Sequence, residues 1–229
     1  MDGVFNIYKE RGWTSFDVVA KMRGILKMKK IGHTGTLDPA AEGVLPVCVG
    51  KGTKLVESFM ADEKVYQAVM LLGVTTDSQD MTGVILSQKE ACADEASVTA
   101  AIESFVGGYD QLPPMYSAKK VHGKKLVDLA RKGIEVERVP RFVKISSIVI
   151  DEMNLPRVKM TVTCSKGTYI RTLCHDIGSR LGCGAAMESL LRTRVGRFTL
   201  EDAITLDELQ HFADEGKAEE HIFPVGKLI

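Results

Sequence analysis

The sequence predicts an α+β fold in which helices flank a mixed, largely antiparallel sheet. Stretches with the alternating apolar pattern of strands are interspersed irregularly with stretches whose apolar residues recur at helical spacing. Most links between these stretches are also too short for the crossovers that join parallel strands. Together these two observations favour a largely antiparallel arrangement.

The first half of the chain is expected to open with a strand at 4–8. A helix then begins at Thr14, where Asp17 completes a capping-box-like start. One face of this helix is expected to hold Phe16, Val19, Met22 and Leu26. The later elements are a short helix with Leu55, Val56 and Phe59 inward, a strand at 65–73, a polar loop at 75–83, a strand at 83–87, and a helix from Ser97 to Val106.

The second half contains the clearest alternation, at 157–165, where Val158, Met160, Val162 and Cys164 fall on one side. A short helix is expected at 126–132, ended by Gly133. A longer helix covers 169–181 and ends at Gly182. The last helix is expected to start at Thr205, with Glu208 three residues later.

The bulk composition is that of an ordinary globular chain. Its 229 residues suffice for one core, or for one large domain with a small appendage. No apolar run approaches the ~20 residues of a membrane span. The five cysteines include no C-x-x-C pair, which argues against a disulfide framework or a zinc site and favours a reducing cytoplasm.

The net charge of zero is the sum of opposed blocks. Residues 116–200 carry 17 basic and 7 acidic side chains, whereas 61–115 carry 2 and 9, and 201–229 carry 2 and 8. The segment 119–144 alone contributes a net charge of +6. Such a segment is either an ordinary solvated face or a surface that binds nucleic acid.

A glycine-rich run from Lys29 to Leu55 surrounds the step Asp38-Pro39. Because glycine costs conformational entropy on folding, the backbone there is expected to be bent for a purpose. The run is either a tight turn or a loop that presents the Asp38 carboxylate to a substrate, as nucleophile or base. Spacing alone leaves both interpretations open.

Other catalytic motifs fail on their spacing. Gly50-Lys51 lacks the glycine five residues earlier that a phosphate-binding loop needs, and no G-x-G-x-x-G or G-x-S-x-G is present. The five histidines are scattered, so no metal site is predicted.

Several motifs, in order along the chain, resemble those of the TruB-type tRNA pseudouridine synthases, which isomerise uridine 55 in the T-arm. The longest is GHTGTLDPAAEGVLPVCVGKGTK at 32–54. The others are YKERGWTSFDVV, DEKVYQAVMLLGVTTDSQDMTG, QLPPMYSAKKVHGKKLVDLARKG, CSKGTYIRTLCHDIG and LLRTRVGRF. The resemblance covers about residues 3 to 210 and implies the pseudouridine synthase fold.

The resemblance also implies roles for single residues. Asp38 would be the nucleophile, Arg171 the arginine that pairs with it, and Tyr66 the aromatic ring that stacks on the target base and can accept its proton. Glu10 departs from the family's usual proline at that position. The residues implied to bind the substrate are His33, Tyr66, Tyr169, Leu190 and Lys9.

The resemblance places an RNA-contacting insertion at about 111–145 in a catalytic domain that covers 1–200. The cations of this arm are Lys119, Lys120, Lys124, Lys125, Arg131 and Lys132. Residues 201–229 form an acidic tail, at the place where a PUA-type RNA-binding domain would begin. The implied substrate is the T-arm stem-loop of tRNA. No cofactor is expected, because the isomerisation is redox-neutral. The chain is also expected to be a cytoplasmic monomer without a metal or a membrane attachment.

Three alternatives remain open at this point. The chain could be a non-catalytic RNA-binding or tRNA-folding protein on the same scaffold, or a pseudouridine synthase with relaxed target choice. An aspartyl phosphotransferase that uses Asp38 is more remote, because metal-binding carboxylates are missing around that residue.

Overall fold

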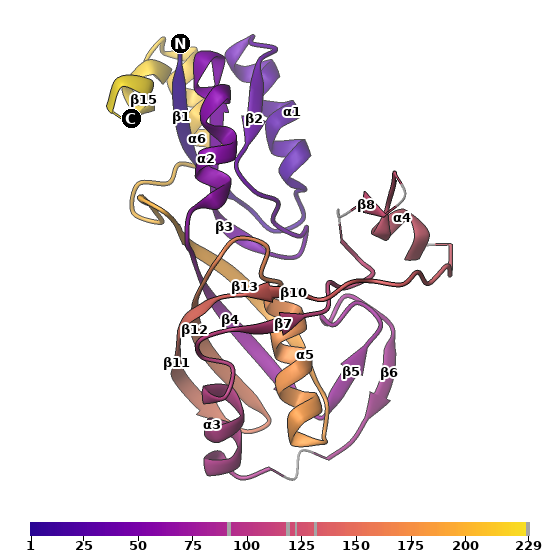
Figure 1. The fold of residues 1–229 in the computed structure, drawn as a ribbon. Coiled ribbons are helices and arrows are strands. Elements are labelled where there is room, and N and C mark those ends of the chain that lie inside the picture. Colours follow the sequence, from indigo (N-terminus) through magenta and orange to yellow (C-terminus); the bar gives the residue numbers. More distant parts are fainter. Residues whose placement is uncertain (91–92, 118–119, 122, 131, 228–229) are drawn as a thin grey trace. The chain divides into compact units, whose positions relative to one another are not determined.

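The computed structural model describes residues 1–229 apart from 91–92, 118–119, 122, 131 and 228–229. The described chain divides into two compact units (Figure 1). Unit 1 comprises residues 1–66 and 190–229, and unit 2 comprises residues 67–189. The strands β4 (Lys64–Leu72) and β13 (Ala185–Val195) each contribute residues to both units.

Unit 1 is built on a mixed sheet. Its strand order is β13-β3-β1-β15, with β2 added on β3 and β14 on β13. β3 is antiparallel to β1, with Phe5 opposite Val47, and parallel to β13, with Arg192 opposite Gly43. The elements of this unit are β1 (Gly3–Lys9), α1 (Ser15–Leu26), β2 (Ile31–His33), β3 (Glu42–Val49), a 3-10 turn (Gly50–Leu55), α2 (Val56–Ala61), β14 (Phe198–Thr199), α6 (Leu206–Asp214), β15 (Phe223–Pro224) and two further 3-10 turns, Ala218–His221 and Val225–Lys227.

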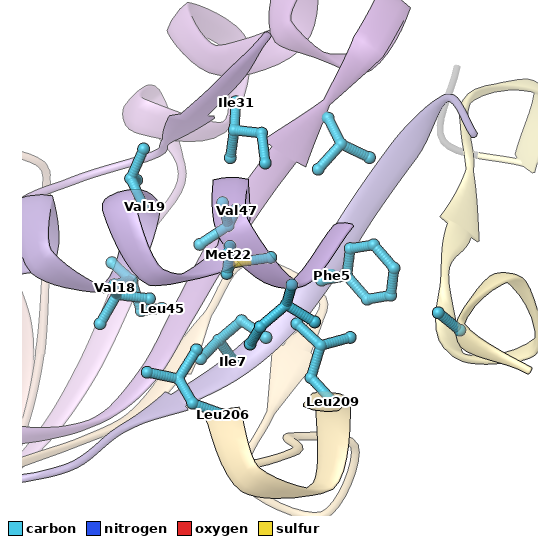
Figure 2. Close-up of a cluster of buried hydrophobic side chains, with 13 residues drawn as sticks. Phe5, Ile7, Val18, Val19, Met22, Ile31, Leu45, Val47, Leu206 and Leu209 are labelled. Carbon is cyan, nitrogen blue, oxygen red and sulfur yellow. The ribbon is translucent and has the colours of Figure 1, made fainter. Parts of the chain in front are cut away.

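Both faces of this sheet are buried. On one face, Phe5, Ile7, Leu45 and Val47 pack against apolar residues of α1 and α6, as Figure 2 shows. On the other face, Val4, Val44 and Cys48 pack with Phe59 of α2 and with Phe198. Residues 201–229 therefore supply part of the unit 1 core, through Leu206, Leu209 and Ala218. The sequence-based division of the chain at residue 200 stays a prediction.

Two expectations for unit 1 are corrected. The run 29–55 is not a loop throughout, because 42–49 is a strand whose residues Val44, Leu45, Val47, Cys48 and Val49 are fully buried. Burial on both faces removes the alternation that marks a half-exposed strand. On α1, the capping box of Thr14 and Asp17 is confirmed, but Phe16 is 64% exposed.

Unit 2 contains the strand order β11-β12-β4-β13 and three small two-stranded sheets. Helices α3 and α5 pack against each other. The elements are β5 (Val74–Thr76), β6 (Ile85–Gln88), α3 (Glu95–Glu103), β7 (Tyr109–Gln111), β8 (Lys120–Val121), β9 (Lys124–Lys125), α4 (Leu126–Ala130), β10 (Arg141–Val143), β11 (Ile145–Asn154), β12 (Arg157–Cys164) and α5 (Ile170–Leu181).

Most element predictions for unit 2 are confirmed, including the buried side of β12 and the left-handed Gly182 that ends α5. Several details differ, among them the end of α3, which is Glu103 instead of Val106. The cap of α3 is Asp94, whose side chain accepts a hydrogen bond from the Ser97 amide, so the helix begins before Ser97. The expected loop at 75–83 begins inside β5, and α4 ends at Ala130. In the described part of the chain, no helix is both long and apolar enough to span a membrane.

Candidate active site

Asp38 lies on a short loop in unit 1, residues 34–41, that connects β2 to β3. These strands pair with His33 opposite Val47, so the loop closes a hairpin. Within the loop, the Ala41 amide donates to the Asp38 carbonyl oxygen at 3.0 Å, which makes the Asp-Pro step a turn. The Asp38 residue is half-buried. The turn interpretation of this step is therefore confirmed, and the presentation of the Asp38 carboxylate to a substrate stays a prediction.

The loop is fastened to the body of unit 1 on both sides of Asp38. The Leu37 amide donates to Ser15 Oγ at 2.9 Å, and Leu37 itself is buried. The Gly12 amide donates to the Pro39 carbonyl oxygen at 2.8 Å. Because the residue before Asp38 and the residue after it are each held by a separate element, the backbone that carries the carboxylate is fixed.

Lys9 lies beneath this loop and is fully buried. Its ammonium donates to the carbonyl oxygens of Trp13 at 2.8 Å, Glu10 at 3.0 Å and Pro39 at 3.5 Å. Burial, reinforced by the nearby Arg192 guanidinium, lowers the pKa of Lys9 to about 8, although the Asp38 carboxylate favours its charged form. Since all three donated bonds go to backbone carbonyls, the geometry suits Lys9 to position the loop.

Arg192 of β13 is a second buried cation at the loop, and the motif analysis gave it no role. Its Nε donates to the Val44 carbonyl oxygen at 2.7 Å, and a terminal nitrogen donates to the Gly35 carbonyl oxygen at 3.3 Å. Gly43, at φ +109°, sits where a Cβ would meet the Arg192 backbone oxygen at 2.2 Å. The strand β3 therefore begins at a place where two backbones touch, which only glycine permits. The LLRTRVGRF motif was the signal that could have singled out Arg192.

His33 stands at the start of the loop. Its Nδ1 accepts a hydrogen bond from the Gly35 amide at 3.3 Å. Burial lowers the pKa of His33, and the Arg192 guanidinium lowers it further. A neutral imidazole whose Nδ1 is an acceptor carries its proton on Nε2. The His33 ring in this form is uncharged and has one N–H donor, and its contact with a substrate stays a prediction.

Two further predicted residues also belong to unit 1. Tyr66 lies on β4 and is 8% exposed, and Leu190 lies on β13 and is likewise 8% exposed. Both side chains are buried. Their contacts with a base stay predictions.

The remaining predicted site residues, Tyr169 and Arg171, lie in unit 2 at the start of α5. Arg171 is 4% exposed, and the Tyr169 ring centroid lies 5.9 Å from its guanidinium carbon. A terminal nitrogen of Arg171 donates to the Tyr116 carbonyl oxygen at 2.6 Å. The other terminal nitrogen lies 3.8 Å from Asp80 Oδ2. Because Asp38 and Arg171 belong to different units, their pairing stays a prediction.

The motif analysis assigned no role to Asp80. Its Oδ1 accepts hydrogen bonds from Ser78 Oγ at 2.8 Å and from both the amide and the hydroxyl of Thr82, at 2.9 and 2.5 Å. These donors fix the carboxylate, so that its other oxygen, Oδ2, faces Arg171. An anion held in this way orients a buried guanidinium. The signal available in the sequence was the cluster of turn-forming polar residues at 77–83.

The predicted RNA-contacting arm is described only in part. β8 and β9 pair as a short hairpin, with Lys120 opposite Lys125, and Lys132 is exposed. Lys119 and Arg131 lie outside the described residues, as do the side chains of Lys120, Lys124 and Lys125. Among the described residues, no group of three His, Cys, Asp or Glu side chains is placed to hold a metal ion.

Comparisons with known proteins identify the family of the chain. The family profile described as "TruB family pseudouridylate synthase (N terminal domain)" matches residues 23–170. The profile described as "tRNA pseudouridylate synthase B C-terminal domain" matches residues 171–229. Curated proteins called tRNA pseudouridine synthase B are 50% identical in Clostridium acetobutylicum and 52% identical in Lachnoclostridium phytofermentans. Each of these matches covers all of this chain, and 78% and 77% of the respective relative.

Solved structures support the fold. A chain in the structure described as "Crystal Structure of a Cbf5-Nop10-Gar1 Complex" is 33% identical, with a TM-score of 0.78. A chain in "Structure of H/ACA RNP bound to a substrate RNA containing 2'-deoxyuridine" is 31% identical, with a TM-score of 0.74. Each match covers 98% of this chain, which spans 60% of the length of each solved chain. From the profile matches and from relatives about half identical over the whole chain, we conclude that this chain belongs to the TruB family of pseudouridylate synthases.

Proposed function

We propose that the chain converts uridine 55 in the T-arm loop of tRNA to pseudouridine, with Asp38 as the nucleophile. One observation carries the assignment of Asp38. The loop that bears it is fastened through Leu37 on one side and Pro39 on the other, while the carboxylate-bearing residue stays half-buried. Such preorganisation suits a group that must meet one atom of a bound substrate.

The reaction conserves every atom of the nucleotide. The N1–C1′ bond breaks, the uracil ring rotates, and a C5–C1′ bond forms. The proton on C5 leaves, and N1 gains a proton in place of its bond to C1′. Asp38 acts as the carboxylate that attacks the nucleotide, and Tyr66 stacks on the base and accepts the C5 proton. Because the isomerisation changes no oxidation state, it requires neither an oxidant nor a reductant.

Arg171 is proposed to pair with Asp38 and to keep it ionised, since a nearby opposite charge lowers a carboxylate pKa. For this role the Arg171 guanidinium must itself be held in place. The Tyr116 carbonyl and the Asp80 carboxylate hold the guanidinium from within unit 2. Arg171 thus brings a fixed positive charge to the reacting carboxylate.

The target base must leave its stack before Asp38 can reach it, at a cost of a few kcal/mol. Stacking on Tyr66 offsets part of this cost, because a base–aromatic stack is worth about 1–3 kcal/mol. The neutral His33 ring is proposed to occupy space that the flipped bases vacate. The cations of the 111–145 insertion are proposed to bind the phosphates on either side. We also propose that the enzyme acts as a cytoplasmic monomer.

The test is to incubate the chain with a T-arm stem-loop whose uridines carry tritium at C5. The proposal predicts release of one tritium per stem-loop, and chemical sequencing should place pseudouridine at position 55 alone. A stem-loop with cytidine at that position is the matched control and should release no tritium. Modification at several other uridines would show a relaxed target choice. Tight binding without release would show an RNA-binding protein that performs no isomerisation.

A further inference from the structure

The helix α5 begins without a cap from its own sequence. Tyr169 occupies the N-cap position in an extended conformation, and its side chain makes no capping hydrogen bond. Its carbonyl accepts the first helical bond, from the Leu173 amide at 3.0 Å. Since helix starts leave backbone groups that need partners, something else must fix this residue.

The partner is the side chain of Gln111, which comes from β7 and is 1% exposed. Its Oε1 accepts a hydrogen bond from the Tyr169 amide at 2.8 Å, and its Nε2 donates to the Tyr169 carbonyl oxygen at 3.0 Å. The carboxamide therefore pairs with both backbone groups of one residue, as a neighbouring strand would. The orientation of the amide is determined, because the Tyr169 N–H can only donate and its carbonyl can only accept.

The Gln111 carboxamide makes one further hydrogen bond, to a residue of its own strand. Its Nε2 also donates to Tyr109 Oη at 2.7 Å, and the Tyr109 hydroxyl donates to Asp176 Oδ2 at 2.7 Å. Burial raises the pKa of Tyr109 well above its usual range, so the phenol keeps its proton for Asp176. The donor direction runs from Gln111 through Tyr109 to Asp176, which is on α5.

Five residues after Gln111, the carbonyl of Tyr116 accepts the hydrogen bond from Arg171. One short segment of the chain, 111–116, therefore holds both Tyr169 and Arg171. Gln111 does so through its side chain and Tyr116 through its backbone. The same segment is the entry to the predicted RNA-contacting arm.

We propose that Gln111 is a positioning residue, which sets the geometry of Tyr169 and Arg171 by clamping the backbone at the start of α5. This inference rests on the proposed function, because the importance of that geometry depends on the roles of Tyr169 and Arg171. A misplacement of about 1 Å at a reacting centre can cost ~100-fold in rate. The clamp therefore affects the chemical step more than RNA binding.

The first test replaces the carboxamide by an apolar chain of similar length, Gln111→Met. Single-turnover rates should fall at least about tenfold, while KM for the stem-loop changes less than about threefold. The Tyr169 amide should exchange with solvent at least about tenfold faster, and core amides such as Val158 should keep their protection. Unchanged rate and unchanged exchange at Tyr169 would overturn the proposal.

Tyr109→Phe is the matched control. It removes the hydroxyl but leaves both Gln111–Tyr169 bonds, so its rate should stay within about threefold of wild type. A loss as large as that of Gln111→Met would assign the effect to the Tyr109–Asp176 pair and overturn the clamp.

A second variant, Gln111→Glu, keeps the side-chain volume and the oxygen that accepts from the Tyr169 amide. It keeps the proposal testable if Gln111→Met does not fold. A carboxylate cannot donate to the Tyr169 carbonyl, but a protonated carboxyl can. The rate of this variant relative to wild type should therefore rise as the pH falls from 8 to about 5.5, since burial raises a glutamate pKa. A purely structural defect would give a ratio independent of pH and would overturn the proposal. If wild type forms no pseudouridine, the proposed function fails, whereas hydrogen exchange at Tyr169 still tests the clamp.

Discussion

The ammonium nitrogen of Lys9 lies 3.5 Å from the carbonyl oxygen of Pro39, the residue that directly follows Asp38. The Gly12 amide donates to the same oxygen at 2.8 Å. Strand β1 and the turn after it thus bind the loop next to its carboxylate. The resemblance assigned Lys9 to substrate binding. The amine is fully buried, however, and donates its hydrogen bonds to backbone carbonyls, which suits a positioning role.

Lys9→Met should lower kcat about tenfold and leave KM for the stem-loop nearly unchanged, because the loop that carries Asp38 loses a support and no RNA contact is removed. The free energy of unfolding should fall by about 1–3 kcal/mol, since buried carbonyls lose a donor. Steady-state kinetics and urea denaturation measure both effects. Lys51→Met, at an exposed lysine of the same unit, is the control and should change neither. A rise in KM with kcat unchanged would instead place Lys9 in RNA binding.

The pH dependence of stability should also reveal the lowered pKa of Lys9. Its folded-state pKa, about 8, lies below the ordinary value of 10.5. Between these two pH values the unfolded chain binds more protons than the folded one, so the contribution of Lys9 to stability rises with pH. The free energy of unfolding of wild type relative to Lys9→Met should therefore increase from pH 7 to pH 10. A difference that stays constant over this window would show that burial does not depress the Lys9 pKa.

Asp80→Asn should lower kcat by at least about tenfold. The amide oxygen can keep the hydrogen bonds from Ser78 and Thr82, so the substitution removes only the negative charge that faces Arg171. Single-turnover kinetics at saturating RNA measure this effect. The control is Asp77→Asn, because Asp77 accepts hydrogen bonds from Tyr116 and Val84 and shows no ion pair with Arg171 among the described contacts. Equal losses in both variants would indicate a disturbed loop and leave the charge of Asp80 without a special role.

Replacing Lys119, Lys120, Lys124 and Lys125 together by alanine should weaken stem-loop binding and flatten its dependence on salt. Each lost phosphate contact should reduce the slope of log affinity against log salt by roughly 0.7–0.9. Binding titrations at several salt concentrations measure the slope. The control removes four exposed lysines elsewhere: Lys54, Lys89, Lys159 and Lys217. If both quadruple variants flatten the slope equally, the effect is one of net charge and the arm does not contact phosphates.

The sequence predicts most of this fold because most elements carry local signals. The capping boxes at Thr14 and Thr205, the alternation of β12 and the glycine that ends α5 are all determined by neighbouring residues. The strand β3 was missed because burial of both faces removes the alternating pattern, and because the strand contains Gly43 and Pro46, two residue types that are uncommon in strands.

From the sequence, only those site residues that lie in recognisable motifs could be predicted. Asp38 and Arg171 stand in recognisable runs, but their supports come from distant parts of the chain. Gln111 meets Tyr169 across 58 residues, and Arg192 meets Val44 across 148. Gln111 and Arg192 each lie in a motif, but no local pattern shows which distant residue each of them contacts, because tertiary packing selects the partner.

The most direct test of the account is the rate of pseudouridine formation by Asp38→Asn. An asparagine side chain cannot act as the nucleophile, so tritium release from the stem-loop should fall to background while RNA affinity stays within about threefold of wild type. Asp207→Asn, at an exposed carboxylate of the same unit, is the matched control and should keep full activity. Mass spectrometry must exclude deamidation of the new asparagine. Measurable pseudouridine at position 55 from verified Asp38→Asn protein would contradict the central claim that this carboxylate performs the reaction.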